Sequence, residues 1–171
     1  MIKTIDAITE FFGKLSAWIY FFIGLIVTYE VVMRYVFTRP TIWVDDISRI
    51  AQIWATYIGI AFALKHRDMI VIDVAFKDHH SIIRKILETF SLVVIIVFSG
   101  IVIYYGYQIW LYSTLKGHTT GSYLSIPKWF TQAPILVGFT LLLIQALAEI
   151  IKVWTIGIAF DEESEMVKES V

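Results

Sequence analysis

The sequence predicts an all-α membrane protein, a four-transmembrane-helix bundle with its N- and C-termini in the cytoplasm. Three observations lead to this prediction. Of the 171 residues, 58% are hydrophobic and only 17% are charged, against about 25% charged residues in a typical soluble domain. The mean hydropathy is +0.73, which leaves too little polar surface to cover a soluble core. Four stretches are also long enough to cross a bilayer, which takes about 20 apolar residues.

The same composition excludes several classes of function. It argues against a soluble enzyme, a soluble binding module and a disordered chain. The net charge of -1 gives no basic field that would attract nucleic acid. Because the chain has no cysteine, it has no disulfide, thiolate metal site, iron–sulfur cluster or cysteine nucleophile.

The first two predicted spans cover residues 15–36 and 44–64. Arg39-Pro40 separates them, because a proline disfavours helical angles in the residue before it. Asp45 and Asp46 suit the positive N-terminus of the second helix. No small-residue cleavage site follows the first span, so we expect an uncleaved anchor rather than a signal peptide.

The third and fourth predicted spans cover residues 83–112 and 130–154. At about 1.5 Å per residue the third would be roughly 45 Å long, so it must tilt strongly or project beyond the membrane. Gly117, Gly121 and Pro127 break the chain before the fourth. We therefore expect a four-helix transmembrane domain over residues 1–157 and an acidic cytoplasmic tail over residues 158–171.

The distribution of lysine and arginine predicts the orientation, since these residues favour the cytoplasmic side. With four spans, both termini and the 65–85 loop share one side. That side carries nine of the 14 basic residues, namely Lys3, Lys14, Lys65, Arg67, Lys77, Arg84, Lys85, Lys152 and Lys168. The other side carries Arg34, Arg39, Arg49, Lys116 and Lys128. We therefore expect both termini in the cytoplasm.

Polar residues gather at the outer end of the first two spans. Glu30 and Arg34 are four residues apart and share a helix face. They form either a self-neutralising pair near the interface or a contact that positions a partner. Asp45 or Asp46, then Arg49 and Gln52, follow one face of the second span. This stripe is either helix capping with local pairing, or a stripe that docks a partner or specifies the bundle.

Small residues recur every fourth position in the second span, at Ala51, Ala55, Gly59 and Ala63. In lipid, small residues let two helix backbones approach closely. The ladder therefore predicts tight helix packing. The neighbour is either another helix of this chain or a helix of another protein.

The remaining polar residues of the spans suggest structural roles. We expect Glu149 with Lys152, and Glu88 with Arg84, to pair and extend toward the interface, and Gln108 and Gln145 to join helices. All four histidines fall in loops, which disfavours a haem-bearing redox anchor. No nucleophile with a base can be assembled from the spans, so we expect no enzyme activity, cofactor or metal.

Aromatic residues gather on the outer side of the predicted spans. They form either an interface belt or a rim that also docks a partner. They are Tyr29, Tyr35, Trp43, Tyr104, Tyr105, Tyr107, Trp110, Tyr112, Tyr123 and Trp129.

One stretch resembles a known family. It consists of Tyr29-Glu30-Val31-Val32-Met33-Arg34-Tyr35-Val36-Phe37, then Pro40, then Trp43-Val44-Asp45-Asp46-Ile47-Ser48-Arg49. This pattern is similar to the small membrane subunit, the Q component, of tripartite ATP-independent periplasmic (TRAP) transporters. The likeness continues through Gly59-Ile60-Ala61, Arg67 to Asp73, and Thr120 to Ile135. At Asp68-Met69 the sequence departs from the histidine-containing step that is usual in the family.

The resemblance implies an auxiliary subunit of a sodium-coupled organic-acid uptake system in the bacterial inner membrane. In such systems a periplasmic binding protein captures the substrate. A large membrane subunit carries the substrate and sodium by an elevator-type motion. The small subunit packs beside the static part of the large one, and a role in docking the binding protein is a further expectation. Its partners would be these two proteins and membrane lipids, and no nucleic acid. The substrate stays open.

Two groups of residues are the candidate sites. For packing within the bundle or to the large subunit they are Ala51, Ala55, Gly59 and Ala63. For the periplasmic end and docking they are Glu30, Arg34, Trp43, Asp45, Asp46 and Arg49. The alternative function is an autonomous four-helix proton-coupled exporter, in which Glu30 would be the coupling carboxylate.

Overall fold

The computed structural model describes residues 2–66 and 82–155, apart from the side chains of residues 83 and 84. This part contains four helices, α1 (Ile2–Tyr35), α2 (Trp43–Lys65), α3 (Ile82–Leu115) and α4 (Lys128–Thr155). Each is long and apolar enough to cross a membrane. The predicted all-α fold with four membrane-spanning helices is therefore confirmed. The predicted tail and the 67–73 part of the family-like pattern lie outside the described residues.

All four helices extend beyond the spans predicted from hydropathy, α1 and α3 by the most. The α1 helix begins at Ile2 rather than near residue 15, and α3 has 34 residues. The added first part of α1 is polar on one side, with Asp6 and Glu10 facing other helices. A 34-residue helix is about 51 Å long, so α1 and α3 exceed the thickness of a hydrocarbon core.

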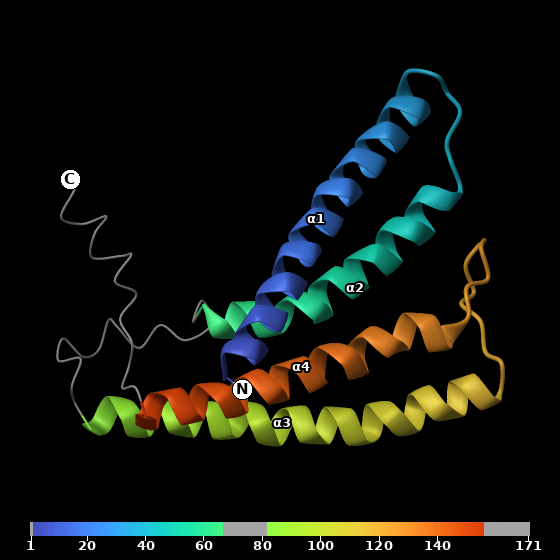
Figure 1. Ribbon diagram of the computed structural model, residues 1–171. Helices are drawn as coiled ribbons and strands as arrows, with labels where there is room; N and C mark the ends of the chain where they lie inside the picture. The colour runs from blue at the N-terminus through green and yellow to red at the C-terminus, as the bar shows by residue number, and fades with distance from the viewer. Residues whose placement is uncertain (1, 67–81, 156–171) are drawn as a thin grey trace, which may run out of the picture.

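The helices are arranged in a row in the order α1, α2, α4, α3. Extensive contacts join α1 to α2, α2 to α4, and α3 to α4, and α1 makes a smaller contact with α4. Among the described residues α3 packs only against α4. Figure 1 shows the α1–α2 hairpin diverging from the α3–α4 hairpin. The bundle is therefore open at one end.

We call the two ends of the bundle, along the direction of the helices, the terminal end and the loop end. The terminal end holds the start of α1 and the ends of α2 and α4, which converge there (Figure 1). The loop end holds the 36–42 connection and the 116–127 connection. The second connection contains one isolated bridge, between Thr119 and Pro127. The orientation of these ends in the membrane stays a prediction.

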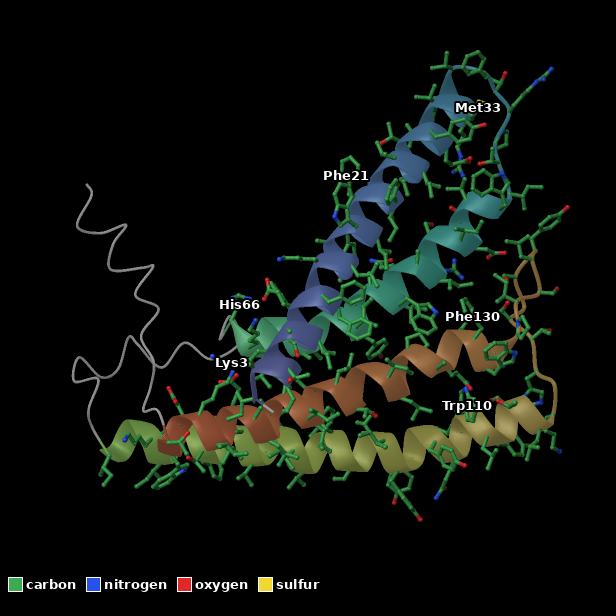
Figure 2. All side chains as sticks on the ribbon, in the orientation of Figure 1. Lys3, Phe21, Met33, His66, Trp110 and Phe130 are labelled. Carbon is green, nitrogen blue, oxygen red and sulfur yellow. The ribbon has the colours of Figure 1, made fainter. Side chains whose placement is uncertain are left out.

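The apolar core lies around α4, which contacts the other three helices. Its buried members are Leu64, Leu92, Phe139, Leu142, Ala146 and Val153. By contrast, α1 turns large apolar side chains outward, and Figure 2 shows Phe21 pointing away from α2. In a membrane such an apolar surface is in contact with lipid or with another protein, and it does not have to be shielded from water.

Candidate functional site: the packing faces and polar ends of α2

The small-residue ladder of α2 faces α1 of the same chain at two of its four positions. Ala55 is 0% exposed, and its carbonyl accepts a hydrogen bond of 2.7 Å from the Ser16 hydroxyl. A Cβ on Gly59 would lie 2.8 Å from Ser16 Oγ. Ala51 and Ala63 are half-buried. At Ala55 and Gly59 the close neighbour is therefore α1.

The opposite side of α2 meets α4 at a second close approach. Gly138 of α4 lies directly against the backbone of Tyr57, and a Cβ there would be 2.7 Å from the Tyr57 carbonyl carbon. The Tyr57 ring packs on Phe139 with centroids 6.0 Å apart. Sequence reasoning missed this contact because Gly138 belongs to no ladder of small residues in α4. Helix α2 is thus held between backbone contacts on two sides.

At the loop end, Glu30 is buried and fully engaged. It is 5% exposed, and its Oε1 accepts bonds of 3.0 and 2.7 Å from the Nε and an Nη of Arg34. Its Oε2 accepts a bond of 2.9 Å from the Thr41 backbone N–H, and the Thr41 hydroxyl also contacts it. The predicted Glu30–Arg34 pair is confirmed. Sequence reasoning missed Thr41, through which Glu30 fastens the 36–42 connection to α1.

The two neighbouring aspartates of α2 have different roles. Asp46 is buried, and its Oδ2 accepts a bond of 3.0 Å from the Leu124 backbone N–H in the 116–127 connection. Asp45 and Arg49 are exposed. Trp43 is 40% exposed and lies 6.5 Å from the Tyr29 ring. Of the six predicted loop-end residues, Glu30 and Asp46 are thus buried and bind within the chain, and Arg34 is an exposed residue that binds Glu30. Like Arg34, Trp43, Asp45 and Arg49 lie at the surface.

At the terminal end, a closed polar network joins α1 to α4. Lys152 Nζ donates bonds of 2.7 Å to Asp6 Oδ1 and to Glu149 Oε1. Gln145 Nε2 donates to the same two oxygens at 3.1 and 2.9 Å. The Thr9 hydroxyl donates a bond of 2.8 Å to Gln145 Oε1. Both polar atoms of the Gln145 side chain therefore have hydrogen-bond partners inside the protein, as a residue that is 0% exposed requires.

This network bears on two predictions for α4. The Glu149–Lys152 pair is confirmed; Glu149 is buried and Lys152 also binds Asp6 of α1. Its extension toward the membrane interface stays a prediction. Gln145 does join two helices, as predicted. Gln108 of α3 is exposed. Glu88 is buried, and the side chain of its predicted partner Arg84 lies outside the described residues.

A second ionic contact at the terminal end joins α1 to α2. Lys65 Nζ binds Glu10 Oε2 at 2.7 Å and the Asp6 backbone carbonyl at 3.3 Å. His66 Nε2 lies 3.3 Å from the same Glu10 oxygen. Figure 2 shows Lys3 of α1 and His66 at this same end. These contacts hold α1, α2 and α4 together at the terminal end.

The described residues offer no assembled chemical centre. Within residues 2–66 and 82–155, no three His, Asp or Glu side chains gather as a metal site requires. His79 and His80 lie outside these ranges. Of the predicted aromatic residues, Tyr104, Tyr105, Tyr107 and Tyr112 are exposed along α3, and Trp110 donates a bond of 3.0 Å to the Trp129 carbonyl.

Comparison with known proteins identifies the family. No curated protein matches the chain. A sequence model of the tripartite ATP-independent periplasmic transporters, DctQ component, matches residues 23–156. The match covers most of the chain, including all of α2, α3 and α4 and the last part of α1. It agrees with the family resemblance drawn from residues 29–49. The chain therefore belongs to the DctQ family and is a small membrane subunit of a tripartite ATP-independent periplasmic transporter.

Proposed function

We propose that this chain is a static bracing subunit of a sodium-coupled organic-acid uptake transporter. One observation carries the proposal: backbone contacts hold α2 on two sides, at Ser16 of α1 and at Gly138 of α4. Side chains so closely packed leave little freedom for relative motion. A rigid plate of helices suits a subunit that widens the fixed frame of an elevator-type transporter, while the large membrane subunit moves the substrate and sodium.

We further propose that the terminal end lies in the cytoplasm and the loop end in the periplasm. The excess of lysine and arginine at the terminal end supports this orientation. The exposed loop-end residues Arg34, Trp43, Asp45 and Arg49 would then face the side where the substrate-binding protein approaches. Exposed charges of this kind act mainly on the rate and orientation of docking.

The state of Glu30 weighs against the autonomous proton-coupled exporter. A coupling carboxylate must exchange its proton and its partner during transport. Glu30 instead lies near the end of α1, and both of its oxygens accept hydrogen bonds, from Arg34 and from Thr41. Such a carboxylate suits a structural latch.

The proposal is tested by purifying the tagged chain from native membranes in mild detergent and identifying what accompanies it. We expect stoichiometric recovery of a large polytopic membrane protein. In proteoliposomes we expect sodium-driven organic-acid uptake only when this chain, the large subunit and the binding protein are all present. Recovery of this chain alone as a dimer, with transport by that dimer, would overturn the proposal in favour of the exporter.

Docking of the binding protein needs a separate test. Asp45→Lys reverses an exposed charge and is therefore a suitable test. Asp46→Asn is not, because it would weaken the internal hydrogen bond from Leu124. We expect Asp45→Lys to raise the KM for uptake with little change in the melting temperature. Unchanged uptake in Asp45→Lys and in a matching Arg49→Glu variant would remove the loop-end surface from the docking proposal.

A further inference from the structure

An exposed face of α2 carries polar side chains along the helix, away from the loop end. Arg49, Gln52 and Thr56 follow one another at steps of three and four, and all three are exposed. Gln52 lies about 14 Å along the helix from Trp43, at 1.5 Å per residue. With the boundary of a hydrocarbon core about 30 Å thick placed at Trp43, Gln52 would lie close to the middle of that core.

Thr56 is satisfied within the chain. Its hydroxyl donates a bond of 2.8 Å to the Gln52 backbone carbonyl and lies 2.6 Å from the Tyr20 hydroxyl of α1. The Gln52 side chain, by contrast, has no hydrogen-bond partner of this kind among the described residues. In the described part of the chain, no group hydrogen-bonds its amide, and no carboxylate pairs with Arg49.

Arg49 and Gln52 differ in whether their polar groups can reach the membrane interface. The long side chain of Arg49 can extend its charge toward the loop end. The short side chain of Gln52 cannot bring its amide to either interface, and lipid offers that amide no hydrogen bond. An amide at this depth is stable only beside another polar group, and in membranes such groups come from neighbouring helices.

We infer that a transmembrane helix of the large membrane subunit covers this face and hydrogen-bonds Gln52. The inference rests on the proposed function, since it assumes that this chain assembles with that subunit. The contacting helix carries a Ser, Thr, Asn or Gln side chain opposite Gln52. The α1–α2 side of the row is therefore the assembly face, and the outer side of α3 faces lipid.

Site-specific cross-linking tests this face directly. Because the natural chain has no cysteine, Gln52→Cys introduces a unique attachment point for a benzophenone maleimide in membranes that contain the whole transporter. Val94→Cys on the exposed side of α3 is the matched control. We expect light to join the large subunit to position 52 and not to position 94. Capture at position 94 alone, or of a second copy of this chain at position 52, overturns the inference.

A substitution tests the hydrogen bond itself. We expect Gln52→Leu to lower co-purification of the large subunit about three- to tenfold, as for one interhelical hydrogen bond in a membrane, and Gln52→Asn to restore part of it. Gln108→Leu, the same change on exposed α3 near the loop end, should leave recovery unchanged. If the natural chain recovers no large subunit, the proposed function fails. If it does, but Gln52→Leu recovers as much, only this inference fails.

Discussion

The contact between Gly138 and Tyr57 gives the sharpest test of the fold, because it joins the two hairpins. In Gly138→Ala the new methyl group would lie 2.7 Å from both the carbonyl carbon and the Cβ of Tyr57. Backbone cannot rotate away as a side chain can. The substitution must therefore push α4 from α2 or displace Tyr57 from Phe139.

The magnitude follows from a matched control. Gly100→Ala places the same methyl group on α3, where nothing lies within 4 Å of it. Both variants gain the same helix preference of alanine over glycine, about 1 kcal/mol in a helix interior. The difference between the two variants therefore isolates the overpacking, for which we expect about 1–3 kcal/mol. Gly138→Ala should be the less stable of the two.

Unfolding of the purified chain in detergent measures this difference. Pairs of spin labels on introduced cysteines, one on α1 and one on α3, report whether the hairpins separate. We expect Gly138→Ala to have a lower melting temperature than Gly100→Ala, and longer or more broadly distributed distances between the labels on α1 and α3. Equal stability with unchanged distances would refute the close approach of α2 and α4.

Three further variants probe the other contacts. Gly59→Leu should disrupt the α1–α2 seam by displacing Ser16, and a variant with unchanged thermal stability and unchanged partners would contradict the close packing at this position. Gln145→Leu removes the amide that donates to Asp6, so we expect a loss of about 1–3 kcal/mol in unfolding free energy, measured by thermal denaturation; a smaller effect than that of Gln108→Leu would argue against the network. Glu30→Ala should free the 36–42 connection and speed its cleavage by chymotrypsin, whereas an unchanged cleavage rate would show that the carboxylate does not fasten it.

Local contacts were predictable from the sequence because helical spacing fixes them. Glu30 and Arg34 are four residues apart, and Glu149 and Lys152 are three residues apart. Both spacings place the two side chains on one helix face, so both pairs could be predicted directly from the sequence. Thr41 on Glu30 and Leu124 on Asp46 could not, since each depends on the path of a connection between helices. The direction of the Glu149–Lys152 pair was also unpredictable, because it depends on Asp6, 146 residues from Lys152.

The sequence by itself determined the class of the protein. Apolar length sets the number of spans, proline and glycine separate them, and the motif between Tyr29 and Arg49 identifies the family. Only the tertiary structure decided which helices touch. In lipid the outward faces of the helices are largely apolar, as the buried faces are, so hydropathy alone does not tell a buried face from a lipid-facing one. The order α1, α2, α4, α3 depends instead on where single residues such as Ser16, Gly138 and Gln145 meet another helix.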